Sequence, residues 1–261
     1  MKRAPRPQPQ AEVTVSEEDG VRYLHLGGDH IQSAMRMKAP DELELDYTRT
    51  MMAFLLFHPQ PRECLMVGLG GGSIPKFIHR RLPRVRTRVV ELNPAVVVAA
   101  RSLFGVPGDG ARLKVDLGDG AKAVHAMDAG CDLLFVDGFV DGDQVPELVS
   151  HEFYAAGHRA LRSPGVLVTN FFGHDRRFDR YLQRLEGTFG GSVICLDARE
   201  DGNVIVFALK GASRAIAWDE LRRCAARLEA RLGLPFDRYV SGLRKMNRWT
   251  RKELLIAPEG N

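Results

Sequence analysis

The stretch CLMVGLGGGSIP at residues 64–75 decides the fold of this chain. Its apolar start is too short for a buried helix and suits a central strand that is covered on both faces. Gly68, Gly70 and Gly72 then permit a tight turn and let another molecule approach the backbone. Pro75 fits the first turn of a helix, where its missing N–H removes no helical hydrogen bond. Strand, glycine turn and helix form a nucleotide-site geometry; a purely structural tight turn is the alternative.

A carboxylate follows the glycine turn at the spacing that a nucleoside site needs. Residues 88–91 (RVVE) predict a second strand ending at Glu91, about 20 residues after the turn. An acid at the tip of this strand can accept hydrogen bonds from both hydroxyls of a ribose; a solvated strand-end glutamate is the alternative. Residue 73 is serine, so the later glycine of the dinucleotide pattern GxGxxG is missing. This spacing favours an S-adenosyl-type nucleoside, which has no pyrophosphate.

Length and composition indicate a globular protein of one large domain with an appendage. The chain has 261 residues, of which 44% are hydrophobic and 27% charged. No apolar run approaches the ~20 residues that cross a bilayer, and residues 1–11 predict a disordered tail rather than a signal peptide. We therefore expect a cytoplasmic protein without a membrane partner. The four cysteines form no CxxC pair, so we expect buried free thiols and no metal site.

The basic charge balance does not by itself predict nucleic-acid binding. The net charge is +4, and much of the excess lies on the tail and after residue 210. The arginines of residues 217–232 share a predicted helix with Glu220 and Glu229, and no aromatic residues interleave with them. A solvated helix face is the preferred interpretation, and no nucleic-acid partner is expected.

The order of strand-like and helix-like segments predicts an α/β fold. Residues 12–42 form a small β-rich region with a hairpin signal at Glu18-Asp19-Gly20. Residues 43–210 begin with a helix at 43–57 and then alternate, which predicts a parallel sheet with helices on both faces. Residues 211–261 form a C-terminal helical extension with helices at 217–232 and 236–249. Strands are expected near 63–67, 86–91, 112–116, 132–137 and 165–171, and helices near 74–82, 94–104, 120–127, 147–161 and 176–188.

The last two strands break this alternation. Residues 192–196 and 203–209 are strand-like, and the link of residues 197–202 is too short for a crossover helix, so the two must pair antiparallel. A parallel sheet closed by an antiparallel hairpin is typical of class I methyltransferase-like (Rossmann-like) folds. We therefore expect that fold, with a mostly parallel sheet and a small N-terminal β domain.

Two further strand ends carry acids where ligands bind in open α/β sheets. Asp119 can accept from the exocyclic amine of adenine while the N–H of Gly120 donates to a ring nitrogen, although Asp119 is equally plausible as a helix N-cap. Asp137 follows the apolar run LLFV and is placed to act on whatever meets the nucleoside.

Taken together, these motifs resemble the polyamine aminopropyltransferases, the spermidine synthase family, from about Leu26 to Lys210. Also similar are SHEFY at 150–154 and LRSPGVLV at 161–168. The resemblance implies a small N-terminal β domain before a methyltransferase-like domain, and a homodimer.

The resemblance also implies a reaction and roles for single residues. An amine would attack the methylene next to the sulfonium of decarboxylated S-adenosylmethionine and release methylthioadenosine, with no prosthetic group. Gln32 and Glu91 would hold the sulfur end and the ribose, Asp119 and Gly120 the adenine, and Asp137 would accept the proton.

Two positions depart from the family pattern. In this chain Gly71 stands at the acidic position of the family's GGGDG turn. Val140 stands at the second acidic position of the family's D-x-x-D-P loop. In the family, the acids at these two positions contact ammonium groups of the substrates. A buried cation without a carboxylate partner is costly. Asp141, Asp46 or Tyr47 are candidate replacements. Two alternatives follow: an S-adenosylmethionine-dependent methyltransferase, with room at Gly71 for the cofactor carboxylate, and a non-catalytic nucleoside-binding protein.

Overall fold

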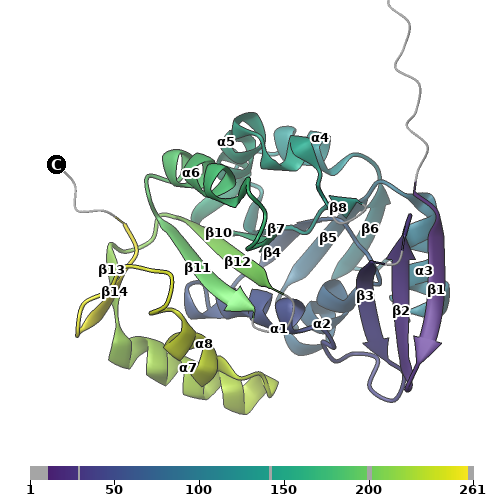
Figure 1. Cartoon of the computed structure of the whole chain (residues 1–261), viewed down its shortest axis with the longest axis horizontal. Coiled ribbons are helices and arrows are strands. Elements are labelled where there is room, and N and C mark those ends of the chain that lie inside the picture. Colours follow the sequence, from purple (N-terminus) through teal and green to yellow (C-terminus); the bar gives the residue numbers. More distant parts are fainter. Residues whose placement is uncertain (1–10, 29, 141–142, 199–201, 258–261) are drawn as a thin grey trace, which may run out of the picture.

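The computed structural model describes residues 11–28, 30–140, 143–198 and 202–257. A seven-stranded sheet with helices on both faces forms its centre, and a three-stranded sheet lies at one side (Figure 1). This arrangement confirms the α/β fold class with a small N-terminal β region. The tail predicted at residues 1–11 lies almost wholly outside the described residues, as does Asp141.

The large sheet has the strand order β11-β12-β10-β7-β4-β5-β6. Its parallel part runs from β10 to β6, and β12 pairs antiparallel with both β10 and β11. The hairpin predicted from the short link after residue 196 is therefore confirmed. In chain order the strands are β4 (Glu63–Val67), β5 (Arg86–Glu91), β6 (Leu113–Leu117), β7 (Cys131–Val136), β10 (Leu161–Phe172), β11 (Val193–Ala198) and β12 (Asn203–Lys210).

Helices cover the two faces of this sheet over two separate buried clusters. One face carries α4 (Gly120–His125), α5 (His151–Ala160) and α6 (Phe178–Thr188). The other carries α1 (Asp46–Met51), the 3-10 helix η1 (Met52–Leu56), α2 (Ser73–Arg81), α3 (Pro94–Leu103), α7 (Trp218–Leu232) and α8 (Phe236–Gly242). The segment predicted as one helix at 43–57 is thus the pair α1 and η1.

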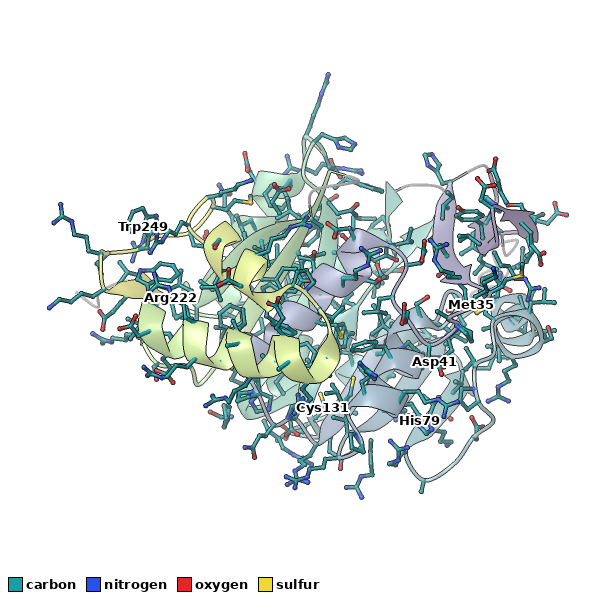
Figure 2. The ribbon with its side chains drawn as sticks, turned by 90° about the horizontal axis from the view of Figure 1, so that it is seen from below. Met35, Asp41, His79, Cys131, Arg222 and Trp249 are labelled. Carbon is teal, nitrogen blue, oxygen red and sulfur yellow. The ribbon has the colours of Figure 1, made fainter. Side chains whose placement is uncertain are left out.

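The small sheet consists of β1 (Val13–Glu18), β2 (Val21–Leu26) and β3 (Ile31–Arg36). Asp19 and Gly20 have φ values of 49° and 75°, as the two-residue hairpin turn at this position requires. The small sheet is joined to the large one through the buried ammonium of Lys76. Its Nζ donates to the carbonyl oxygens of Phe104 at 2.6 Å and Pro40 at 2.7 Å, and lies 3.3 Å from the sulfur of Met35 (labelled in Figure 2).

Two predicted helices have different bounds in the structure. The helix expected at 147–161 starts at His151, because the Ser150 hydroxyl accepts from Phe153 N–H and caps it; a 3-10 turn, η2 (Pro146–Val149), precedes it. The helix expected at 236–249 ends at residue 242. Beyond it, the Asn247 amide pairs with both backbone groups of Cys195, which covers the free edge of β11.

The C-terminal extension also holds a strand pair that the sequence did not predict. β13 (Ala215–Ala217) and β14 (Glu253–Leu255) pair antiparallel and bring the two ends of the extension together. All four cysteines are buried free thiols. Among the described helices none is long and apolar enough to cross a membrane, and the described residues contain no cluster of metal-ligand side chains.

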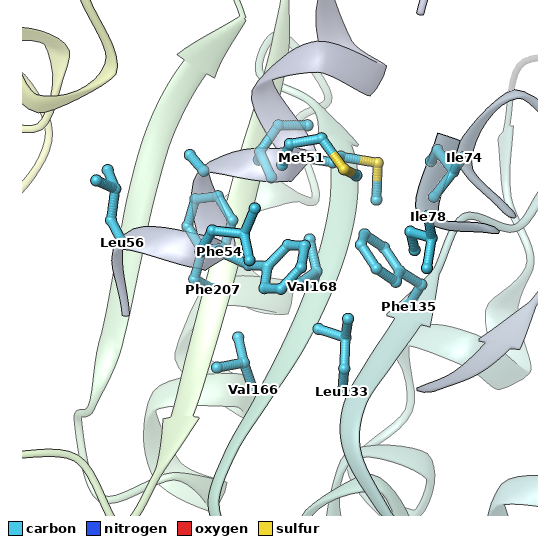
Figure 3. Close-up of a cluster of buried hydrophobic side chains, with 14 of the residues drawn as sticks. Met51, Phe54, Leu56, Ile74, Ile78, Leu133, Phe135, Val166, Val168 and Phe207 are labelled. Atoms are coloured by element: carbon cyan, nitrogen blue, oxygen red, sulfur yellow. The ribbon is translucent and has the colours of Figure 1, made fainter. Parts of the chain in front are cut away.

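The core under the large sheet makes a direct stability prediction. Phe54 of η1 is fully buried and meets Phe135 of β7 edge to face, with ring centroids 5.6 Å apart (Figure 3). We expect Phe54→Ala to lower the free energy of unfolding by about 3–5 kcal/mol, through lost burial and the cavity left behind. Urea denaturation measures this loss. Val98→Ala is the control: Val98 is 66% exposed, so a change within about 0.5 kcal/mol is expected there. Equal effects of the two substitutions would contradict this account of the core.

Candidate active site

The glycine turn lies between the ends of β4 and β7, where close packing requires it. Gly68 has a φ of +90°, and a Cβ built on it would lie 2.5 Å from the carbonyl oxygen of Asp137. Gly70 and Gly72 also have positive φ values, and Gly72 is the N-cap of α2. The predicted strand, turn and helix are therefore all present, with Pro75 in the first turn of the helix.

Glu91, at the end of β5, holds the loops that follow two strands. One carboxylate oxygen accepts from Leu69 N–H and the other from Asn93 N–H, each at 2.8 Å. Burial raises the pKa of Glu91, and the backbone N–H groups of Asn93, Leu69 and Leu92 act in the opposite direction. A carboxylate can accept about four hydrogen bonds, so the predicted bonds from ribose hydroxyls can be added to those from the backbone.

The loop after β6 is joined to Glu91 by a backbone hydrogen bond. Gly118 N–H donates to the Glu91 carbonyl at 2.8 Å. Asp119 accepts from Lys122 N–H at 3.1 Å, so it is the N-cap of α4. A Cβ at Gly120 would overlap the side chain of Val67, which explains the glycine there. The capping role of Asp119 is therefore present, and its adenine-reading role with Gly120 stays a prediction.

Asp137 follows β7 and is held by side chains from two other elements. Tyr47 of α1 donates its hydroxyl to one carboxylate oxygen at 3.2 Å, and Asn170 of β10 donates its amide to the other at 3.5 Å. Burial raises the pKa of Asp137 to about 6, although both of these hydrogen bonds lower it. A carboxylate with this pKa is suited to exchanging protons near neutral pH.

A buried amide chain behind Asp137 was missed by the sequence analysis. Asn203 donates to the side-chain oxygen of Asn170 at 2.8 Å, and Gln144 donates to the Asn170 carbonyl at 2.7 Å. Gln144 lies in β9 (Asp143–Gln144), which pairs with β8 (Phe139–Val140) in the loop after Asp137. The available signal was Thr169-Asn170, two polar residues near the carboxyl end of an otherwise apolar strand.

Strand β3 packs over the glycine turn and brings Gln32 to the same place. The Gln32 carbonyl accepts weakly from the Tyr47 hydroxyl at 3.4 Å, while the buried Ser33 hydroxyl accepts from Gly71 N–H at 2.8 Å. A Cβ at Gly71 would lie 2.9 Å from Ser33 Cβ and 3.0 Å from the ring of Phe104. An acid at position 71 therefore requires its neighbours to move.

The other candidate acids are placed differently. Asp46 is 2% exposed, and its carboxylate lies 3.5 Å from the Arg238 guanidinium of α8. It therefore has a cationic partner from the C-terminal extension. The backbone of Val140 belongs to β8, and Asp141 lies outside the described residues.

The structure thus gathers Gln32, Tyr47, Glu91, Asp119 and Asp137 around the glycine turn at the carboxyl ends of β4, β5, β6 and β7. The site therefore holds several hydrogen-bond acceptors and the buried carboxylate of Asp137 at one end of the sheet. The ends of parallel strands are where ligands bind in such sheets.

Comparisons with known proteins identify the family. No family model matches the chain. It is 40% identical over 258 residues to the polyamine aminopropyltransferase of Chromobacterium violaceum, covering 98% of both chains. A solved spermidine synthase with the transition-state analogue AdoDATO has a TM-score of 0.63 at 20% identity, over 88% of this chain and 84% of that one. Human methyltransferase-like protein 13 with SAH has a TM-score of 0.65 at 25% identity, over 80% of this chain and 96% of that one. The chain belongs to the polyamine aminopropyltransferase family.

Proposed function

We propose that this protein transfers an aminopropyl group from decarboxylated S-adenosylmethionine to an amine. The observation that carries this proposal is the carboxylate of Asp137. It has a pKa of about 6 and is held by Tyr47 and Asn170 beside the glycine turn. The family membership supports the same reaction class.

In the proposed reaction the nitrogen lone pair of the acceptor amine attacks the methylene carbon next to the sulfonium. The carbon–nitrogen bond forms, the carbon–sulfur bond breaks, and its electron pair returns to sulfur as methylthioadenosine leaves. Aliphatic ammonium groups have a pKa near 10, so the amine must lose a proton before its lone pair is free. Asp137 accepts this proton. The hydrogen bonds that Tyr47 and Asn170 donate to its two oxygens fix the orientation of the carboxylate.

The remaining site residues position the donor in this proposal. Glu91 accepts from the ribose hydroxyls while its bonds to Leu69 and Asn93 keep it in place. Gln32 lies at the sulfur end, and Asp119 with Gly120 faces the adenine. Asp141 and Tyr47 are proposed for the acceptor amine, and the active unit is proposed to be a cytoplasmic homodimer that acts on small molecules rather than nucleic acid.

The environment of Gly71 weighs against intact S-adenosylmethionine as the donor. Ser33 and Phe104 occupy the space directly beside this glycine. The missing side chain at position 71 therefore leaves no empty space directly beside the backbone for the carboxylate of the intact cofactor. Because Gly71 has no carboxylate, one ammonium partner is missing, so we expect the preferred amine to differ from that of relatives with an acid at this position.

The reaction class is tested with the two donors side by side. Purified protein is incubated with decarboxylated or intact S-adenosylmethionine and a panel of diamines and monoamines, and chromatography follows methylthioadenosine and S-adenosylhomocysteine. We expect methylthioadenosine with at least one amine and only from the decarboxylated donor. S-adenosylhomocysteine from the intact donor would assign the methyltransferase reaction instead. If no amine yields a product with either donor, the remaining interpretation is a non-catalytic nucleoside-binding protein.

Asp137→Asn tests the proton acceptor. The amide keeps the shape of the carboxylate but cannot take the proton, so kcat should fall by about 10²- to 10⁴-fold. Donor binding, measured by calorimetry, should change little, because Glu91 and the glycine turn are intact. Asp128→Asn, an exposed residue in the loop before β7, serves as the control with near-normal turnover. An Asp137→Asn enzyme with wild-type kcat would exclude this role.

The pH profile tests the hydrogen bond from Tyr47. Asp137 is active as the carboxylate, so activity should rise with pH through about 6 and be lost below it. The Tyr47 hydroxyl lowers the pKa of Asp137, so Tyr47→Phe should move this acidic limb to higher pH. Initial rates with the decarboxylated donor, measured between pH 5 and 8, give the shift. Tyr23→Phe on β2 should leave the limb in place, and an unmoved limb in Tyr47→Phe would show that another group titrates.

A further inference from the structure

A cavity of about 500 Å³ lies between the start of α5 and one side of α6, outside the site described above. The two helices pack side by side on the same face of the large sheet (Figure 1). Its lining includes Ser150, His151 and Glu152 from the start of α5, and Arg177, Arg180 and Arg184 from α6 and its N-cap. None of these residues has a role in the proposed aminopropyl transfer.

Three guanidinium groups on one helix face make this cavity basic. Residues at positions 177, 180 and 184 are spaced by three and four, so they lie on one side of α6. Arg184 donates to the Val149 carbonyl at 2.6 Å and is anchored there, and Arg177 is paired with Asp175 at 3.0 Å. Arg180 is exposed, and within the described chain it has no hydrogen bond or ion pair. Glu152 is the one acid among the lining residues.

The start of α5 adds backbone donors on the opposite wall. Ser150 caps the Phe153 N–H at 3.1 Å, but the N–H groups of His151 and Glu152 have no acceptor among the described residues. Free N–H groups at the first turn of a helix attract negative charge. Both residues line the cavity, so helix and arginines present donors to the same space.

A buried donor beside Arg184 points the same way. Tyr154 is 1% exposed, and its hydroxyl has no hydrogen-bond partner in the described part of the chain. Burial raises the pKa of this hydroxyl, and the charge of Arg184 acts in the opposite direction, which places the two groups near each other. Buried polar groups are usually hydrogen-bonded; Tyr154 is thus an unsatisfied donor near Arg184, although it is not one of the residues that line the cavity.

The chemistry of this lining selects the charge of the ligand. The amine acceptor and the sulfonium donor of the proposed reaction are both cations, and guanidinium groups repel them. Guanidinium groups instead bind phosphate through paired, charge-assisted hydrogen bonds. The volume falls within the range of small-molecule sites, about 300–1,000 Å³. We propose that this cavity binds a phosphate-bearing small molecule.

Calorimetry on the full chain tests this proposal directly. Inorganic pyrophosphate and ADP are the probes, and an excess of methylthioadenosine keeps ADP out of the adenosyl site. We expect saturable 1:1 binding that weakens as salt is raised. Arg180→Gln should raise Kd about tenfold, the factor for one lost charge-assisted hydrogen bond. Arg227→Gln, on the exposed face of α7, is the matched control and should leave Kd unchanged.

The two probes distinguish the sources of the phosphate. Tighter binding of ADP would assign a nucleotide, and equal binding would assign the phosphate groups alone; both support the proposal. No saturable binding of either probe would overturn it, as would an unchanged Kd in Arg180→Gln. A short single-stranded RNA that binds more tightly than both probes would replace it with a nucleic-acid surface. Circular dichroism of each variant confirms that the fold is kept.

Discussion

The buried carboxylate of Glu91 is the constraint on which the proposed nucleoside site depends. Burying a carboxylate without partners costs several kcal/mol, and here backbone N–H groups, two of them from different loops, offset that cost. One belongs to Leu69 in the glycine turn and the other to Asn93 at the start of α3. The Glu91 carbonyl also accepts from Gly118 N–H. A single residue therefore fixes the relative positions of the loops after β4, β5 and β6.

Local signals were enough to predict this part of the molecule. The glycine turn, the acid at the tip of β5 and the short link before β12 each have a physical reason that lies within a few residues. Asn170, Gln144 and Asn203 have no such signal, because they meet only after three separate strands have come together. The early end of α8 has the same cause: Asn247 leaves the helical pattern to pair with the backbone of Cys195, 52 residues away.

The departure at Gly71 acquires a structural meaning from its neighbours. From the sequence it was only a missing acid, with room left for a cofactor carboxylate. In the structure the Ser33 hydroxyl binds the Gly71 N–H, and Phe104 packs against the same spot. Residues from the small sheet and from the end of α3 thus fill the space beside Gly71. An acid at this position would require a change in how these elements pack.

Charge separates the two sites that we propose. Asp137, with Tyr47 and Asn170, offers a carboxylate to cationic substrates, whereas the arginines of α6 face the cavity beside α5. The segment between them is short: Gly138 packs against Leu148 of η2, and η2 leads directly into α5. The cationic groups of the proposed substrates therefore favour the first site, and phosphate groups favour the second. This segment connects the two sites, with Asp137 at one end and the first turn of α5 at the other; a second connection runs through β10, where Asn170 contacts Asp137 and Phe171 packs on Phe178 of α6.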